Sequence, residues 1–418
     1  MLNFFTNKTI CGGLTWEGAI SNPEQCLAKV SGGLGTRLQV GIIVNREDEE
    51  MATVDSSVEL EGATAATGDG LTHSMRKNGR FVNPWPGWAL PSFTGSPNMF
   101  QLMWKFTTGS GDQSSIPSQE VLDTTLPIVT PDFSSPVPED GMKVTWLGHA
   151  SVLVQFENIS VLTDPIFSQR AAPFQFMGPK RYRGPPCRVQ DLPTVDVVVI
   201  SHNHYDHLDY NTVKDLHKRF GEKLCWHVPL GMSAWMKGMG CENVVEQDWW
   251  QEERVKDRED IKVVFTPAAH WCKRGPTDDN LVLWGSWCVI GRRSRFFFGG
   301  DTGYCHGFKE IGKKYGPFNL AAIPIGAYEP RDFMKNQHVN PEEAVQIRQD
   351  VQAKQSLGIH WGTFKLTFEG YLEPRSRVKE AMEAKGLKVE DFFTLDHGGS
   401  KVITIPQTKP SIEKETAT

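Results

Sequence analysis

Residues 200–209 read Ile-Ser-His-Asn-His-Tyr-Asp-His-Leu-Asp. Four side chains that can bind divalent cations lie within six consecutive positions of this stretch: His202, His204, Asp206 and His207. Imidazole and carboxylate groups are common ligands of zinc and similar cations. Four of them exceed the need of one tetrahedral ion that keeps an open position, so we expect His202 and His204 on one ion and Asp206 and His207 on a second. Two ions roughly 3.5–4 Å apart can clamp a phosphoryl group and hold a water between them. The alternative is a polar loop whose histidines only cap strands, and the H-x-H-x-D-H spacing favours metal binding over it.

The sequence on either side of this loop predicts a strand before it and a helix after it. Residues 195–200 form a β-branched run of the kind found in strands that are buried on both faces. Downstream, Val213, Leu216 and Phe220 recur at helical spacing, and Gly221 is a suitable helix stop. The metal-binding residues are therefore expected on a tight loop between a buried strand and an amphipathic helix.

Length and composition place the chain among ordinary globular proteins. Its 418 residues suffice for one large or two modest domains, with 39% hydrophobic and 22% charged residues. The net charge of −6 gives no reason to expect a nucleic-acid partner. The eight cysteines form no C-x-x-C pair, which suits reduced thiols in a cytosol-facing protein. No apolar run approaches the ~18 residues of a membrane span, so we expect a soluble or peripheral protein.

Strand-like runs also precede three later residues that can bind metal, His270, Asp301 and His360. A helix is predicted between the last two of them, from Pro341 to about Gln355. Strands that alternate with helices and end in ligands predict an α/β fold with the site along one sheet edge. The complete set is then His202, His204 and His270 for one ion, Asp206, His207 and His360 for the other, and Asp301 shared between them.

Two upstream residues that could bind metal are expected not to do so. Asp164 follows a strand at residues 161–163, where it is a candidate acceptor for the N–H of a ligand histidine, with a turn cap as the alternative. His149 lies between two strands predicted in residues 144–156. We expect it to be a buried core histidine and not a ligand.

The whole chain divides into four segments by the texture of its sequence. Residues 1–75 are Gly-rich and poorly patterned, and we expect a disordered N-terminal extension. Residues 76–140 form an arm rich in Trp and Pro, residues 141–405 the catalytic domain, and residues 406–418 a tail.

The arm carries large apolar side chains of the type found at membrane–water boundaries. They either contact a membrane or pack on the catalytic domain, and the two can hold together. A basic loop follows at Lys180, Arg181 and Arg183, whose charges are either solvated or meet phosphate headgroups. The candidate membrane contacts on the arm are Trp85, Trp88, Leu102, Met103 and Trp104.

A series of short motifs beyond the metal ligands carries a resemblance to a known family. Together with Ser201-His-Asn-His-Tyr-Asp-His-Leu-Asp-Tyr210, they resemble the metallo-β-lactamase superfamily and, within it, the N-acylphosphatidylethanolamine-hydrolysing phospholipases D. The resemblance covers roughly residues 80–400 and implies an αββα sandwich preceded by an N-terminal extension. The motifs are Asn83-Pro-Trp-Pro, Thr145-Trp-Leu-Gly-His-Ala, Leu162-Thr-Asp-Pro-Ile-Phe, Met177-Gly-Pro-Lys-Arg, His270-Trp-Cys-Lys-Arg, Gly300-Asp-Thr-Gly-Tyr-Cys, Ala327-Tyr-Glu-Pro-Arg and His360-Trp-Gly-Thr-Phe.

The resemblance also implies a reaction and its setting. Two zinc ions per chain would bind the seven ligands, and a membrane phospholipid would be cut into an N-acylethanolamine and phosphatidic acid. Tyr205 and His338 match the substrate-contacting positions of the family. The family is a homodimer on cytosol-facing endomembranes such as Golgi or endosome, with a groove that takes bile acids. This sequence departs from the family pattern after Lys273-Arg274 and at Lys365, which leaves bile-acid binding open.

Phosphodiester hydrolysis needs a nucleophile at neutral pH and a proton for the leaving group. Zinc lowers the pKa of a bound water to about 7, so a hydroxide that bridges two zinc ions is expected to attack phosphorus. We expect Asp206, Asp301 and His338 to take part in catalysis. His338 would position the substrate, and either His338 or a metal-bound water would give the leaving alkoxide its proton.

Two other functions have to be weighed against this one. The same fold serves lactonases, cyclic-nucleotide phosphodiesterases and nucleases, but the sequence offers no basic exosite for a nuclease, and the tryptophan arm suits a lipid better. A non-catalytic lipid-binding or scaffolding protein would have lost its metals, and all seven ligands are present here.

Overall fold

The computed structural model of the chain describes residues 9–10, 14–15, 26–31, 39–44, 68–89 and 116–405. It contains two compact units, Met1–Ala63 and Thr64–Thr418. In the first unit, β1 (Thr9–Ile10) pairs with β2 (Leu14–Thr15), and β3 (Cys26–Ser31) pairs with β4 (Gln39–Val44), both antiparallel. These strands lie in the segment for which the sequence predicted disorder, and β4 is rich in the β-branched residues that strands favour.

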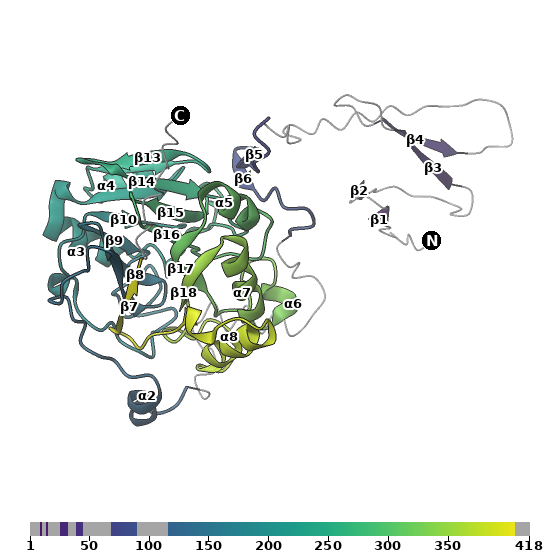
Figure 1. Cartoon of the computed structure of the whole chain (residues 1–418). Coiled ribbons are helices and arrows are strands. Elements are labelled where there is room, and N and C mark those ends of the chain that lie inside the picture. Colours follow the sequence, from purple (N-terminus) through teal and green to yellow (C-terminus); the bar gives the residue numbers. More distant parts are fainter. Residues whose placement is uncertain are drawn as a thin grey trace, which may run out of the picture. The chain divides into compact units, whose positions relative to one another are not determined.

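The second unit is built around two seven-stranded sheets (Figure 1). The first sheet has the strand order β12-β11-β10-β9-β8-β7-β20, and the second has the order β13-β14-β15-β16-β17-β18-β19. The strands of the first sheet are β7 (Gly141–Gly148), β8 (Ser151–Phe156), β9 (Ile159–Thr163), β10 (Val197–Val199), β11 (Cys225–Pro229), β12 (Val244–Gln247) and β20 (Ser400–Thr404). Those of the second are β13 (Glu252–Val255), β14 (Arg258–Thr266), β15 (Ser286–Ile290), β16 (Arg295–Phe298), β17 (Phe318–Pro324), β18 (Ala353–Ile359) and β19 (Phe392–Phe393).

Helices cover the outer side of each sheet, which completes the predicted αββα sandwich. In Figure 1, α3 and α4 lie beside the first sheet, and α5, α7 and α8 lie beside the second. Packing of α4 against β12 and of α7 against β17 and β18 agrees with this arrangement. None of the helices that the structure describes is both long and apolar enough to cross a membrane. The helices are α2 (Gln119–Thr125), α3 (Tyr210–Phe220), α4 (Ser233–Gly238), α5 (Gly307–Tyr315), α6 (Arg331–Met334), α7 (Pro341–Asp350) and α8 (Glu373–Ala384).

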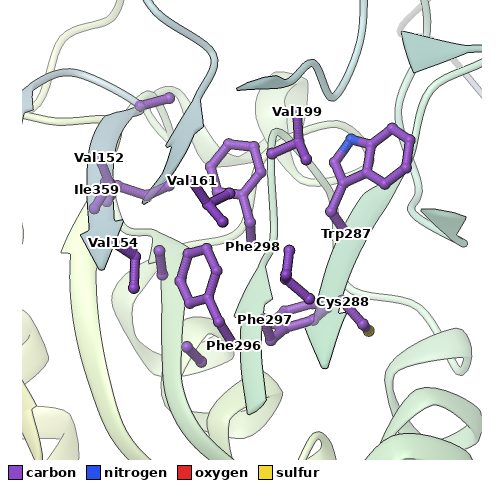
Figure 2. Close-up of a cluster of buried hydrophobic side chains, with 14 of the residues drawn as sticks. Val152, Val154, Val161, Val199, Trp287, Cys288, Phe296, Phe297, Phe298 and Ile359 are labelled. Carbon is purple, nitrogen blue, oxygen red and sulfur yellow. The ribbon is translucent and has the colours of Figure 1, made fainter. Parts of the chain in front are cut away.

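The main core lies between the two sheets. Valines of β8, β9 and β10 meet Phe296, Phe298 and Trp287 of the second sheet (Figure 2). All three aromatic side chains are fully buried, and each such burial contributes roughly 1.5–3 kcal/mol. The indole of Trp287 also donates a hydrogen bond of 2.8 Å to the carbonyl of Ile200. The core therefore ties the second sheet to the residue at which the metal-ligand loop begins.

The predicted elements around that loop are confirmed. β10 precedes it, and α3 follows it with Asp209 as N-cap and Gly221, at φ 56°, as C-cap. The helix after Asn340 also starts as predicted at Pro341. It ends at Asp350, however, and not near Gln355 as predicted. Residues 353–359 pair with β17 as strand β18, and the pairing with a buried strand overrides the helical tendency of this segment.

Candidate metal centre

The fold brings all seven predicted ligands together at one end of the sandwich. The loop after β10 carries His202, His204, Asp206 and His207, and the segments after β14, β16 and β18 carry the other three. Asp206 and His204 are half-buried, and the rest are buried. Strands from both sheets thus end at the same site, although the ligands are up to 158 positions apart in the sequence (His202 to His360, 360 − 202 = 158).

The first group consists of three imidazoles whose nitrogens converge. Nδ1 of His204 is 2.8 Å from Nε2 of His202 and 3.3 Å from Nε2 of His270. Three ring nitrogens at this spacing form a possible donor set for a borderline divalent cation. This grouping is the one predicted for the first ion.

The second group consists of Asp206, His207 and His360, with Asp301 between the two groups. Oδ2 of Asp206 is 3.4 Å from Nε2 of His207 and 3.5 Å from Nε2 of His360. One oxygen of Asp301, Oδ2, is 3.1 Å from Nε2 of His207, and the other, Oδ1, is 3.1 Å from Nε2 of His360.

Asp301 also faces the first group. Its Oδ2 is 3.9 Å from Nε2 of both His202 and His270. The loop that carries it needs a glycine at position 300, since a Cβ there would lie 2.5 Å from Cβ of Ser201. The close approach of the two loops places the carboxylate within reach of both histidine groups.

A buried network orients the two histidines at the centre of the site. Asp164, fully buried, accepts hydrogen bonds from Nδ1 of His207 at 2.6 Å and from the backbone N–H of Ser201 at 2.7 Å. The Ser201 hydroxyl donates to Asp164 at 2.5 Å and lies 2.8 Å from Nδ1 of His202. Both rings therefore present Nε2 to the site, and the predicted support by Asp164 is confirmed. Ser201, which sequence reasoning passed over, belongs to the same network.

Three residues of the site adopt backbone conformations that side chains other than glycine rarely take. His149, Asp164 and His360 have φ angles of 52°, 31° and 61°. Such angles cost free energy and persist only where the surrounding structure imposes them, most often at functional sites. Each of these residues directly follows a strand, namely β7, β9 or β18. Its side chain contacts another residue of the site.

His149 has a contact that the sequence did not predict. The expectation of a buried core histidine is confirmed, with 1% of the residue exposed. However, its Nε2 lies 3.0 Å from Oδ2 of Asp206, and its ring centroid is 4.1 Å from that of His360. Burial lowers the pKa of His149 to about 3, so the neutral ring can donate a hydrogen bond to the carboxylate. The only signal in the sequence was its place in Gly148-His149-Ala150. In the structure Gly148 has a φ of 102°, which favours glycine.

Burial and neighbouring charges shift the pKa values of the site residues. Burial alone would raise the pKa of Asp301, but the nearby charge of His207 holds it well below its usual range. Burial lowers the pKa of His204 to about 3 and that of His270 to about 4. The pKa of His360 is raised to about 9, against the effect of burial, by the charge of Asp301. Buried anionic carboxylates thus lie beside the neutral imidazoles of His204 and His270 and beside His360, whose proton a bound divalent cation would replace.

The two predicted substrate contacts differ in their surroundings. His338 is buried at the edge of the centre, with Nε2 4.0 Å from Oδ2 of Asp301, and its Nδ1 has no hydrogen-bond partner among the described residues. The hydroxyl of Tyr205 instead donates to the carbonyl of Arg274 at 2.9 Å. The Arg274 guanidinium stacks over the Tyr205 ring at 4.0 Å and donates to two carbonyls of the ligand loop, those of Asn203 and Leu208. Sequence reasoning missed this clamp, whose signal was the cation in the His270-Trp-Cys-Lys-Arg motif.

The described part of the tryptophan arm packs on the catalytic domain. Trp85 is 9% exposed, stacks on Trp249 and donates to the carbonyl of Ala268. Trp88 is half-buried and donates to the carbonyl of Asn336 at 2.6 Å. For Trp85 the packed alternative is thus correct, because its ring is enclosed by protein. Leu102, Met103 and Trp104 lie outside the described residues.

The basic loop is mostly internal, which corrects the expectation that all three of its cations are either solvated or in contact with phosphate headgroups. Arg181 is 4% exposed and donates to the carbonyl of Ile166 at 2.9 Å, and Arg183 is 3% exposed and pairs with Asp123 at 2.8 Å. Only Lys180 is exposed. The carboxylate partner of Arg183 lies 60 positions upstream, so the local sequence did not indicate it.

Comparisons with known proteins agree with this site and fold. A Beta-lactamase superfamily domain matches residues 160–361. The chain is 46% identical over 342 residues to N-acyl-phosphatidylethanolamine-hydrolyzing phospholipase D 1 of Caenorhabditis elegans, a match that covers 77% of this chain and 92% of that protein. It is 29% identical over 252 residues to a UPF0173 metal-dependent hydrolase of Methanopyrus kandleri, covering 60% of this chain and 95% of that one. Among solved structures, a possible metal-dependent hydrolase from Veillonella parvula aligns with a TM-score of 0.50 at 14% identity, over 62% of this chain and 98% of that one.

The αββα sandwich with histidine and aspartate ligands at its strand ends defines a metal-binding hydrolase of the metallo-β-lactamase superfamily. Within that superfamily the match to the nematode enzyme extends over nearly its whole length. The chain belongs to the family of N-acylphosphatidylethanolamine-hydrolysing phospholipases D.

Proposed function

We propose that this chain is a di-zinc phospholipase D that hydrolyses N-acylphosphatidylethanolamines to N-acylethanolamines and phosphatidic acid. The observation that carries the proposal is the position of Asp301, whose two oxygens face different histidines while the carboxylate lies between two complete ligand groups. A single-ion site has no use for this arrangement. The family relationship supplies the class of substrate.

The donor set fits two zinc ions. Three imidazoles would hold the first ion, two imidazoles and Asp206 would hold the second, and Asp301 would contact both. When bound, such a pair supplies a nucleophile from water at neutral pH and withdraws charge from phosphoryl oxygens.

The remaining chemistry belongs to the side chains around the centre. Asp164, Ser201 and His149 fix the rings and the Asp206 carboxylate, so that the ligands need no reorganisation when the substrate arrives. His338 is free to contact the phosphodiester or to give a proton to the leaving alkoxide, because its Nδ1 has no partner among the described residues. Tyr205 would contact the substrate through its ring, as its hydroxyl already bonds to Arg274.

The setting of the reaction is proposed from the family relationship. The chain would act as a homodimer on cytosol-facing endomembranes such as Golgi or endosome, where its lipid substrate resides. A bile acid remains a candidate ligand. The loop after Arg274 is closed on itself by Asp278, which accepts from the backbone N–H of Gly275 at 2.7 Å, so binding there would have to fit this compact turn.

The experiment is hydrolysis of N-acylphosphatidylethanolamine in detergent micelles and oxygen-18 water, with the products identified by mass. Attack at phosphorus puts the label into phosphatidic acid and leaves the N-acylethanolamine unlabelled. Label in the N-acylethanolamine would mean that a C–O bond had broken and would refute the proposed attack. Asp301→Asn should lower zinc content and turnover together, and normal turnover at full zinc content in this variant would refute the shared-ligand role.

A further inference from the structure

An apolar loop projects from the first layer of the fold near the metal centre. Phe174, Phe176 and Met177 are 55%, 77% and 50% exposed, and the two phenylalanine rings stack with centroids 5.4 Å apart. Exposed aromatic side chains that adjoin one another on a protein surface mark an interaction site more often than single ones do. We call residues 170–180, which contain them, the FQF loop.

The FQF loop is held in its projecting shape by its own polar groups. The backbones of Arg170 and Lys180 form an isolated antiparallel β-bridge. The backbone N–H of Ala171 donates to the carbonyl of Pro179 at 3.0 Å. The exposed side chain of Gln175 makes two 3.0 Å hydrogen bonds with the backbone of Arg170. These hydrogen bonds hold the backbone of the loop between the two exposed rings of Phe174 and Phe176.

The base of the loop is tied to two of the four segments that carry candidate metal ligands, those after β10 and β18. Ser168, just before it, bonds to the Asp209 carboxylate at the end of the ligand loop, at 3.1 and 2.9 Å. Arg181, just after it, forms an isolated antiparallel β-bridge with Phe364. The ring centroid of Phe364 is 5.1 Å from that of His149. A surface that binds the rings of Phe174 and Phe176 is therefore held near the metal centre.

The charges of the loop suit an anionic surface. No acidic residue occurs in residues 165–190, and neither Arg170 nor Lys180 forms an ion pair with any described residue. In a symmetric contact between two copies of this chain the same patch would face itself, and like charges would meet. An apolar tip above unpaired cations instead matches a lipid bilayer, where rings enter the interface and cations meet phosphate headgroups.

We propose that the FQF loop is a membrane-docking element that seats the metal centre on an anionic bilayer. Phe174, Phe176 and Met177 enter the interface, and Lys180 and Arg170 contact headgroups. The choice of a lipid surface rests on the proposed function, whose substrate is a membrane phospholipid. Its residues differ from Trp85 and Trp88 of the tryptophan arm, which pack on the domain.

The test is sedimentation of the full chain with phosphatidylcholine vesicles, prepared with and without phosphatidylglycerol. Replacing two large apolar side chains in Phe174→Ser with Phe176→Ser should lower the partition coefficient at least about tenfold. Val402→Ser, at a residue 47% exposed on β20, is the matched control and should change nothing. Phe174→Trp with Phe176→Trp should restore binding, and Lys180→Glu should weaken binding only to vesicles that contain phosphatidylglycerol.

Each outcome decides for or against the inference. Unchanged sedimentation of the double serine variant, with an unchanged melting temperature, overturns it. So does a loss of self-association in sedimentation velocity without a loss of vesicle binding, because the loop would then be a contact between copies. The vesicles contain no substrate. If the chain fails to hydrolyse N-acylphosphatidylethanolamine while the double variant still loses vesicle binding, the proposed function fails and the docking element stands.

Discussion

Replacing Asp164 by asparagine should weaken zinc binding about 10- to 100-fold. Asp164 makes no predicted contact with metal, and it is fully buried behind His207. Its two oxygens accept three hydrogen bonds, from Nδ1 of His207 and from the backbone N–H and hydroxyl of Ser201. An amide of the same shape offers one acceptor oxygen and one NH2 group, so at least one of these donors would face another donor.

The magnitude follows from that mismatch. A buried donor without an acceptor costs about 1–3 kcal/mol. Each 1.4 kcal/mol is a factor of ten in an equilibrium constant. A cost of about 1–3 kcal/mol that destabilises the zinc-bound state therefore weakens zinc binding roughly 5- to 140-fold, which spans the expected 10- to 100-fold loss. The loss falls there because a misdirected His207 ring no longer presents Nε2 to the site.

The assay is zinc competition against a chromophoric chelator, with zinc content measured in parallel. Asp209→Asn is the matched control: this buried carboxylate caps α3 and bonds to Ser168 and Thr212, but it touches no ligand histidine. We expect it to lower the melting temperature and leave zinc affinity within about threefold of the wild type. Wild-type zinc affinity in Asp164→Asn, or an equal loss in Asp209→Asn, would refute the orienting role of Asp164.

Two further predictions concern stability and the arm. Burial would raise the pKa of Glu157, but three backbone N–H groups of residues 292–294 donate to it and hold the pKa below its usual value. A depressed carboxyl pKa contributes stability above the unfolded value of 4.5 that is lost as pH falls through the folded value. Glu157→Gln should therefore lower the melting temperature at pH 7, and by a steadily smaller amount as pH falls below 4.5. An equal loss at pH 7 and throughout the acid range would show that the hydrogen bonds and not the charge are responsible. Leu102→Asp with Met103→Asp, outside the described residues, should weaken vesicle sedimentation and leave zinc content intact; unchanged sedimentation would exclude this part of the arm from the membrane contact.

The sequence by itself determined the chemistry of the centre. Six of the ten residues from Ile200 to Asp209 are His, Asp or Tyr. The β-branched run before this stretch and the helical spacing after it predict a strand, a loop and a helix from the local sequence. The seven candidate ligands were chosen by residue type and by their places at strand ends, because both are properties of short segments. Asp164 was predictable for the same reason, since it directly follows β9.

The tertiary structure alone decided which side chains meet across long separations. His149 reaches Asp206 over 57 positions, and Arg274 reaches the carbonyl of Asn203 over 71. It also separated Phe364, 7% exposed, from Phe176, 77% exposed, although both are aromatic residues in loops. The end of α7 depended in the same way on the pairing of β18 with β17. Burial and partner choice depend on how two sheets pack, and the local sequence specifies the faces of each element without specifying which faces come together.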